Sequence, residues 1–564
     1  MRKLLVILAL VLAATSCNID EVFEADGGVP SIELDSPTGV YKTKVGYALT
    51  ISPTYRNADE TTTYTWTCEG VRVATTPTYS FTPASTGRQF LQIEVRNQYG
   101  SAKREIRVDV VERDVAKISL AGADEGFVAA IGELLPLRPH VEECALPISY
   151  SWSLDGEVVG TERDYDFVGT QAGQHHMVLC ATTDDGAASL EFDITVCRAE
   201  DMPLEWCFEQ TEFNMASGRT VLLRPLDIRG GEGATYEWAV DGTLVQTGAD
   251  ASYAFTSSDI GQHELCITAR RDNASRTQRL TVNVCAAEGE FFRAATASSS
   301  AAWTKIYEVC AAPGQYINED FEATTADEAC RKADELMRRG SCVSLGSFGG
   351  YIVVGFDHSV VTTGGYDLAI QGNPFDTSSE PAIVYVMQDE NGDGVPNDTW
   401  YELAGSETGK AETLRDYAVT YYRPTASCMS VEWRDNRGNS GRVEYIASHH
   451  DQPSYYPQWN DRASYTLRGT RLAARNYDMT GNGAQWMLPP YDWGYADNFS
   501  TIDGATDGGV NRFRITDAID HNGESITLAY IDFVKIQTAC NANSGWLGEQ
   551  SSEVCAIYDC ALLD

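Results

Sequence analysis

A tyrosine and a tryptophan, separated by one residue, occur three times in the first half of this chain at one fixed interval. The three pairs stand 86 residues apart: Tyr64/Trp66, Tyr150/Trp152 and Tyr236/Trp238. Self-similarity at a constant spacing is the mark of a tandem array of like domains. Each repeat therefore has to provide an equivalent place for its tryptophan, and we expect that place to be the domain core.

Each repeat continues with the same strand-like features. An acidic residue and a glycine follow each tryptophan and predict a hairpin turn: Glu69-Gly70, Asp155-Gly156 and Asp241-Gly242. A Tyr-x-Phe pair comes next, at Tyr79/Phe81, Tyr165/Phe167 and Tyr253/Phe255. Apolar residues then alternate with polar ones, which is typical of half-buried strands. One core tryptophan per repeat within an all-strand pattern favours an immunoglobulin-like β-sandwich.

The three repeats resemble bacterial PKD-like domains over about residues 30–287, with predicted domains at 31–112, 113–198 and 199–287. His175, His176 and His263 precede strands without a further metal ligand nearby, so we do not interpret them as a metal site. Such an array either holds a working head away from a membrane or binds partners along its edges.

The first 17 residues have the pattern of an export signal. Arg2 and Lys3 precede an apolar run that ends at Ala14, too short to span a bilayer, before Thr15-Ser16-Cys17. Small residues before a cysteine resemble a bacterial lipobox, which implies acylation of Cys17; the alternative is an ordinary secretory signal that contains a cysteine. The acidic linker at 18–30 resembles the signal that exports Bacteroidetes lipoproteins to the cell surface. We expect a surface-exposed lipoprotein anchored in the outer membrane.

The net charge of −39 argues against a nucleic-acid partner, because neutralising phosphates requires a surplus of lysine and arginine. Fourteen cysteines follow Cys17. An exported protein permits disulfides, but free thiols in strands, such as Cys180 and Cys266, are an equally good interpretation. Cys555 and Cys560 are the one pair close enough in sequence to suggest a local bridge.

The region after a linker at 288–303 lacks the repeat and is predicted to be one larger domain, 304–564. One helix is expected from a Thr324 or Thr325 N-cap to Gly340. Seven or more strands follow, separated by glycine-rich turns, which favours a jelly-roll-like β-sandwich. The predicted segments are 351–356, 366–370, 382–387, 417–422, 442–446, 465–472 and 525–537. The predicted fold class of the whole chain is all-β.

A loop after one of these predicted strands has the pattern of a calcium site. Oxygen-bearing residues alternate, and Gly394 stands at the sixth position, where the backbone must turn sharply. The predicted ligands are Asp389, Asn391, Asp393, the Val395 carbonyl, Asn397 and Asp398. Trp400 replaces the closing glutamate of an EF-hand, so the sequence predicts a structural calcium ion in an all-β domain and not a helical sensor.

No catalytic signature accompanies these carboxylates, since neither Gly-x-Ser-x-Gly nor His-Glu-x-x-His occurs, and we predict no enzyme. Aromatic residues instead cluster in two proline-bearing loops, where rigid rings suit a sugar or a macrocycle. The predicted ligand-binding residues are His449, His450, Tyr455, Tyr456, Trp459, Tyr491, Trp493 and Tyr495. The alternative is that these rings form a second small core, in which Trp486 and Trp493 would be the first members.

Several segments together resemble Bacteroidetes surface lipoproteins with PKD-like repeats and a C-terminal β-sandwich, many of which belong to cobalamin (vitamin B12) uptake loci. The resemblance rests on residues 312–318, 347–358, 366–373, 379–381 and 388–402, within about 304–550. It implies a protein that binds cobamides outside the cell, as transported ligand, and assists a TonB-dependent outer-membrane transporter. A histidine could then ligate cobalt. Glycan binding through the same aromatic loops is the alternative, and a hydrolytic enzyme is disfavoured.

Overall fold

The structure is a computed structural model that describes residues 28–563, apart from 37–38, 143, 447–449, 451, 481–482, 484 and 507. The predicted leader, its Cys17 and nearly all of the acidic linker lie outside the described residues. The chain divides into two compact units, one up to Val111 and one from Glu112 onward. Within the described part, no helix has both the length and the apolar character needed to cross a membrane.

The first unit is a single repeat with two layers of strands. Its large sheet has the order β2 (Val40–Lys44), β9 (Gly100–Val111), β8 (Gly87–Asn97), β5 (Thr63–Cys68) and β6 (Val71–Ala74). Its small layer consists of two pairs: β1 (Ser31–Glu33) with β4 (Thr54–Arg56), and β3 (Leu49–Ile51) with β7 (Tyr79–Phe81). Strand β2 runs parallel to β9, whereas the other pairs are antiparallel.

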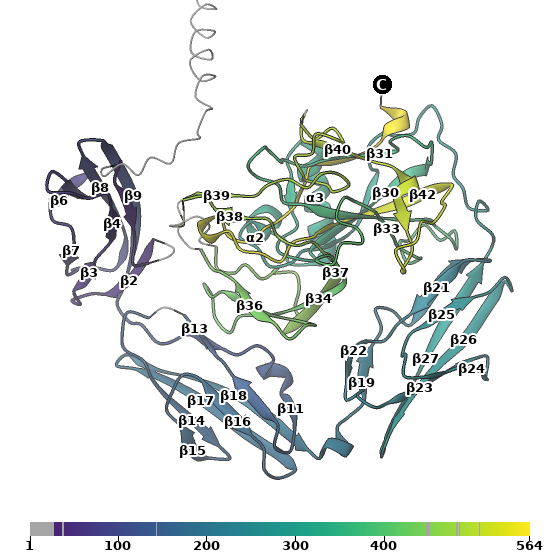
Figure 1. Cartoon of the computed structure of the whole chain (residues 1–564), viewed down its shortest axis with the longest axis horizontal. Coiled ribbons are helices and arrows are strands. Elements are labelled where there is room, and N and C mark those ends of the chain that lie inside the picture. Colours follow the sequence, from purple (N-terminus) through teal and green to yellow (C-terminus); the bar gives the residue numbers. More distant parts are fainter. Residues whose placement is uncertain are drawn as a thin grey trace, which may run out of the picture. The chain divides into compact units, whose positions relative to one another are not determined.

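The second and third repeats have the same strand order (Figure 1). In repeat 2 the large sheet is β11 (Phe127–Ala130), β18 (Gly186–Cys197), β17 (Gly173–Thr183), β14 (Ser149–Leu154) and β15 (Glu157–Gly160), with the pairs β10 (Ile118–Ser119)/β13 (His140–Val141) and β12 (Leu134–Leu137)/β16 (Tyr165–Val168). In repeat 3 it is β20 (Glu212–Ala216), β27 (Ala274–Cys285), β26 (Gly261–Arg271), β23 (Thr235–Val240) and β24 (Thr243–Gly248), with the pairs β19 (Glu205–Cys207)/β22 (Leu226–Arg229) and β21 (Thr220–Leu223)/β25 (Tyr253–Thr256). The predicted tandem of immunoglobulin-like sandwiches is confirmed.

The repeating tryptophans are the centres of the three cores. Trp66, Trp152 and Trp238 are fully buried, and each stacks on the tyrosine of the following Tyr-x-Phe pair at 5.6 to 5.7 Å. Each indole N–H donates to a backbone carbonyl 10 to 13 residues later, at 2.9 to 3.0 Å. A buried tryptophan needs such a partner for its one polar group. The prediction that these side chains are core residues is confirmed.

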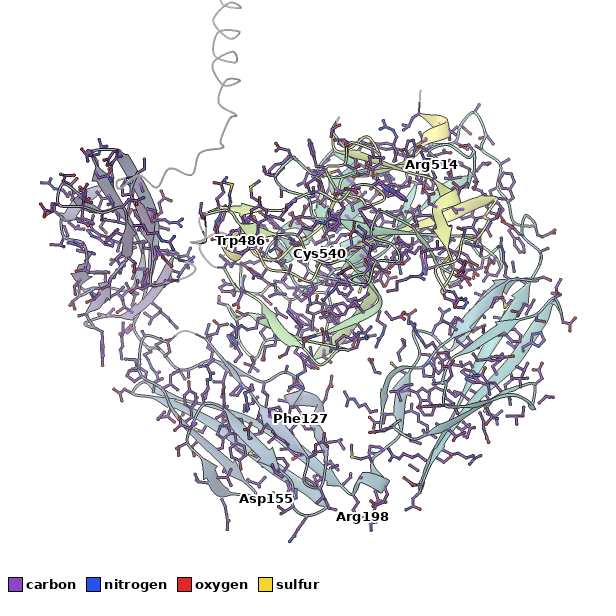
Figure 2. The ribbon with its side chains drawn as sticks, viewed as in Figure 1. Phe127, Asp155, Arg198, Trp486, Arg514 and Cys540 are labelled. Atoms are coloured by element: carbon purple, nitrogen blue, oxygen red, sulfur yellow. A yellow bond between two sulfur atoms is a disulfide. The ribbon has the colours of Figure 1, made fainter. Side chains whose placement is uncertain are left out.

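The acidic residue and glycine after each tryptophan form a two-residue hairpin turn in which both have positive φ. In repeat 2, Asp155, labelled in Figure 2, accepts from the His176 N–H and bonds the His175 ring, both at 2.8 Å. In repeat 3, Asp241 bonds the His263 ring at 2.8 Å. These histidines therefore fasten a turn to the neighbouring strand.

The C-terminal region, here called the head, is built around a six-stranded antiparallel sheet. Its order is β28 (Lys305–Cys310), β30 (Tyr351–Val361), β42 (Tyr530–Thr538), β32 (Ala382–Met387), β33 (Tyr401–Leu403) and β41 (Ala518–Ile519). The remaining strands are β40 (Val510–Phe513), β31 (Leu368–Gln371) and β44 (Ala556–Asp559) in one sheet, β36 (Ser440–Val443), β35 (Val431–Asp435), β34 (Leu414–Tyr422) and β37 (Ser464–Arg471) in another, and the pairs β29 (Val343–Ser344)/β43 (Glu553–Val554) and β38 (Tyr477–Asp478)/β39 (Trp486–Met487). All seven predicted strand segments contain strand residues.

The predicted helix is α3 (Ala326–Arg338). The Thr325 hydroxyl accepts from the Glu328 N–H at 3.2 Å, and Ala329, Ala333 and Met337 form its buried stripe. The sequence allowed for one or two short helices in this domain, and the second is α2 (Ile317–Phe321), whose position was not predicted.

The one disulfide among the described residues joins Cys342 to Cys555, next to β29 and β43. The suggested Cys555–Cys560 bridge is therefore wrong, and Cys560 is a free thiol. The two cysteines of the actual bridge are 213 residues apart, and only the pairing of β29 with β43 brings them together. Cys180 and Cys266 are free, as the thiol interpretation requires.

Candidate ligand pocket and cation loop

The tyrosines of the two aromatic loops are buried in the head. Tyr455 and Tyr456 belong to a core with Tyr421 and Tyr465, and the Tyr455 hydroxyl donates to the His450 carbonyl at 2.8 Å. Tyr455 and Tyr456 are at most 1% exposed, so their rings offer no face to a ligand in this structure. The interpretation as a second small core applies to this loop.

The second loop is divided between core and surface. Tyr491 and Tyr495 are buried, with the Tyr491 hydroxyl 3.5 Å from the Cys540 sulfur, whereas Trp486 and Trp493 are half-buried. Figure 2 labels Trp486 and Cys540. If these rings formed a core, the sequence favoured Trp486 and Trp493 as its members. In the structure the two tyrosines are the buried residues, and the two tryptophans are only half-buried. Trp493 stays available to a ligand.

The remaining predicted ligand residues are scattered. Trp459 packs against Phe321 of α2 at 5.0 Å and fills the edge of the main head core. His450 bonds the Glu319 carboxylate at 2.9 Å and lies 4.2 Å from the Tyr316 ring. His449 lies outside the described residues. Of the eight predicted residues, only Trp493 lines the cavity described next.

A cavity of about 280 Å³ opens beside Trp493. Its walls come from β40 and the residues that follow it, the Trp493–Asp503 loop, the end of β33 and the segment just before β31. They are formed by Tyr366, Leu403, Ala404, Trp493, Gly494, Ile502, Asp503, Arg512, Phe513, Arg514 and Asp517. We call this cavity the Trp493 pocket. Ligand sites that bury drug-sized molecules start near 300 Å³, so this cavity suits one ring system or one end of a larger ligand.

The Trp493 pocket combines flat rings with charges of both signs. The Arg514 guanidinium lies 4.5 Å from the centre of the Tyr366 ring, a cation–π distance. Arg514 is labelled in Figure 2 and directly follows β40. Burial raises the pKa of Asp503 and of Asp517. Gly494 has a φ of 90°, and its N–H donates to Asp503 at 3.0 Å, which fixes the carboxylate at the cavity wall.

Sequence reasoning had missed Tyr366, Arg512 and Arg514. A signal was present, because Arg512 lies in β40 and Arg514 follows it two positions later in extended backbone, a spacing that favours the same face. This signal does not locate the pocket by itself, because Tyr366 comes near the arginines only through the pairing of β31 with β40, in which Leu368 lies opposite Phe513.

The predicted cation loop follows β32, all six residues of which are buried. Asp389 accepts hydrogen bonds from the N–H groups of Gly392 and Gly394, at 2.9 and 3.0 Å, and Gly394 has a φ of 72°. Asp393 accepts from the Val395 N–H at 2.8 Å and from the Asn397 amide at 2.9 Å. The loop therefore turns its carboxylates inward, as a cation-binding loop does.

Two carboxyl groups of this segment lack the partners that burial demands. Asp398 is 5% exposed, and its Oδ1 is buried without a hydrogen-bond partner. Both carboxylate oxygens of Glu390 are also buried without a hydrogen-bond partner. Burial raises the pKa of Asp398 to about 8 and that of Glu390 to about 7. Asp398 also experiences the charges of Asp389 and Asp393. A bound cation would offset this repulsion, so these residues fit the predicted calcium ion.

A family model described as PKD-like domain matches residues 29–97. The chain carries PKD-like repeats. It is also similar to human polycystin-1, with 24% identity over 212 residues, which is 37% of this chain and 5% of that protein's length.

Among solved structures, the fibronectin(III)-like modules of Clostridium thermocellum CbhA share 20% identity, covering 30% of this chain and 95% of theirs, with a TM-score of 0.19. The three N-terminal domains of the bacteriophage RB49 outer capsid protein Hoc share 16% identity, covering 46% and 99%, with a TM-score of 0.18.

Proposed function

We propose that the chain is a non-enzymatic surface lipoprotein, anchored through Cys17, whose head captures a cobamide outside the cell and assists its uptake by a TonB-dependent outer-membrane transporter. The observation that carries the proposal is the Trp493 pocket, where the half-buried rings of Trp493 and Tyr366 line a cavity together with Arg512 and Arg514. The repeats act as a spacer between the membrane and the head. The calcium loop stabilises one connection of the head.

The chemistry of the ligand matches this combination of side chains. A cobamide carries a flat heteroaromatic base joined through one phosphodiester to a corrin ring too large for a cavity of about 280 Å³. The base can stack between Trp493 and Tyr366, and aromatic contacts of this kind favour binding by about 1 kcal/mol. The phosphodiester can pair with the arginines, whose planar fork suits phosphate oxygens. The corrin would then remain outside the cavity.

A titration of the full chain with cyanocobalamin tests the proposal, with dicyanocobinamide, which lacks the base and the phosphodiester, as the matched ligand. We expect cyanocobalamin to bind with a micromolar or lower Kd and cobinamide to bind at least about tenfold more weakly, a difference of about 1.4 kcal/mol. Trp493→Ala and Arg514→Gln should weaken only cyanocobalamin. The control is Trp459→Phe, which keeps an aromatic ring at the core edge.

The second candidate is glycan binding, which Asp503 and Asp517 favour because carboxylates accept hydrogen bonds from sugar hydroxyls while the Trp493 face stacks on the ring. A glycan panel in the same titration separates the two functions. Binding of a glycan that Trp493→Ala abolishes, without any response to cyanocobalamin, would replace the cobamide proposal.

A further inference from the structure

A second group of carboxylates shares no residue with the Trp493 pocket or with the predicted cation loop. Glu380 precedes β32, Asp497 lies between β39 and β40, and Glu553 begins β43. One oxygen of each lies within 4.8 Å of the other two. Among the described residues, this is the one group of three acidic, histidine or cysteine side chains that meets this distance. We call it the three-carboxylate cluster.

Backbone donors hold the cluster in place. Asp497 accepts from the Asn373 N–H at 3.0 Å and from the Glu553 N–H at 2.9 Å. Glu380 accepts from the Ser551 N–H at 3.1 Å. The Asn373 side-chain amide reaches the same place: with its NH2 turned inward it lies 3.3 Å from Asp497 Oδ1 and 3.2 Å from Glu553 Oε2. Four side chains from three distant segments thus converge on one point.

The negative charge of the cluster has no visible counterpart. Asp497 is 1% exposed, and the other two side chains are half-buried. Within the part of the chain that the structure describes, no ion pair joins any of the three to a lysine, arginine or histidine. Burial, followed by their mutual repulsion, raises the pKa of Glu380 and of Glu553 well above the ordinary value. Paired buried carboxylates without a counter-charge are costly to keep ionised.

An independent observation comes from Glu549, which belongs to none of these contacts. It is 5% exposed; its Oε1 accepts from the Gln315 N–H at 2.8 Å, while its Oε2 is buried without a hydrogen-bond partner. Its charge acts on Glu380. The charges of Glu553, Glu549 and Glu380 also act together on the Tyr316 phenol, so Glu549 belongs to the same acidic neighbourhood. A buried carboxylate oxygen of this kind calls for a ligand.

We propose that Glu380, Asp497 and Glu553 bind a divalent cation, Ca²⁺ in preference to the others, with Glu549 completing its surroundings. The Asn373 amide, whose NH2 faces Asp497 and Glu553 in this structure, would turn its oxygen toward the bound ion. The donors are all oxygens, which suits Ca²⁺ and Mg²⁺ and disfavours zinc. Ca²⁺ accepts irregular sets of six to eight oxygens, whereas Mg²⁺ demands a regular octahedron and keeps several waters. The ion would link three segments of the head: the residues just before β32, the connection between β39 and β40, and the start of β43.

Metal content of the full chain after dialysis against Ca²⁺ tests the proposal. We expect two ions per wild-type chain, one in Glu380→Gln/Glu553→Gln, and one in Asp389→Asn/Asp393→Asn, which removes the loop ion. The control Glu412→Gln/Glu524→Gln deletes two exposed charges of the same domain and should keep two ions. A Glu380→Gln/Glu553→Gln variant that still binds as many ions as the wild type would overturn the proposal.

Crystals of the wild-type chain soaked in Tb³⁺ supply a readout that does not depend on a variant folding. We expect an anomalous peak in contact with Glu380, Asp497 and Glu553. A map with a peak in the Asp389 loop and none at the cluster, at saturating Tb³⁺, would also overturn the proposal.

Discussion

The repeats and the head treat their carboxylates in opposite ways. In the repeats, Asp155 and Asp241 are largely exposed turn residues whose histidine partners lower their pKa. In the head, Asp398 and Asp497 are buried, and burial raises the pKa of each. The exposed turn aspartates stabilise their domains in the ionised form, through hydrogen bonds to the histidines. The buried acids are stabilised only when a proton or a cation joins them, which is why candidate sites are found in the head.

The two regions also differ in how far apart in sequence their contacts lie. The indole of Trp152 finds its carbonyl acceptor 10 residues later, within one repeat. The three-carboxylate cluster instead requires residues 380, 497 and 553 to meet. The indole contact therefore recurs in all three repeats, whereas the three-carboxylate cluster depends on distant segments that are found only in the head.

The largest effect is expected from Trp152→Ala in repeat 2. Truncating a fully buried tryptophan leaves a large cavity and costs about 3 to 5 kcal/mol, which is much of the stability of a small domain. Differential scanning calorimetry of the full chain should show one transition moved to a markedly lower temperature. Trp493→Ala in the head is the comparison, since a half-buried pocket residue should cost about 1 kcal/mol or less. Equal losses for both substitutions would contradict the distinction between core and pocket tryptophans.

A smaller effect is expected from pH in the head when EDTA keeps cations away. Burial raises the pKa of Asp497 from its ordinary 3.8 to about 7. Its stabilising contribution is thus complete below pH 3.8 and is lost as pH rises through about 7. The melting temperature of the head should therefore fall between about pH 4 and pH 7 and change little above that range. Asp497→Asn should flatten that fall, because an amide has no proton to lose; an unchanged slope would contradict this account.

The smallest effect is expected from His263→Gln in repeat 3. The hydrogen bond to Asp241 raises the pKa of His263 above 6.5 and lowers that of Asp241 below 3.8. The pair therefore stabilises the repeat between these limits: the histidine part fades as pH rises through the raised pKa, and the aspartate part as pH falls through the lowered one. The loss should stay below about 1 kcal/mol, since the pair is exposed to solvent.

Thermal melts at about pH 5.5 and pH 9 would measure this loss, which should shrink at the higher pH because His263 is then neutral. Glu264→Gln on the same strand is the matched control. A loss of the same size at both pH values would show that the ring acts through packing and not through its charge.

The repeats could be predicted from the sequence because their signals are local. The tryptophans, the turns of an acidic residue and glycine, and the alternating strands all make their contacts within one repeat, and each is visible as a short sequence pattern. Helix α3 was predictable for the same reason, since Thr325 caps its own first turn. For the predicted cation loop, the sequence located the turn at Gly394, where the backbone has a φ of 72°, and the calcium ion itself stays a prediction.

The head could be predicted only as a class of fold. Whether an aromatic loop residue faces core or solvent depends on strands elsewhere in the chain, so Tyr455 and Tyr491 could not be told from Trp493. The Trp493 pocket depends on the pairing of β31 with β40, and the disulfide on the pairing of β29 with β43. No spacing within one segment contains that information.

The Cys342–Cys555 bridge closes a covalent ring that contains the Trp493 pocket, the predicted cation loop and the three-carboxylate cluster. A protease that cuts an exposed loop anywhere inside this ring leaves the two pieces attached to each other. Such a nicked head keeps the mass of the intact chain on a gel without reductant and separates into fragments only when the bridge is reduced. Cutting within the ring therefore cannot release either half of the head from the repeats.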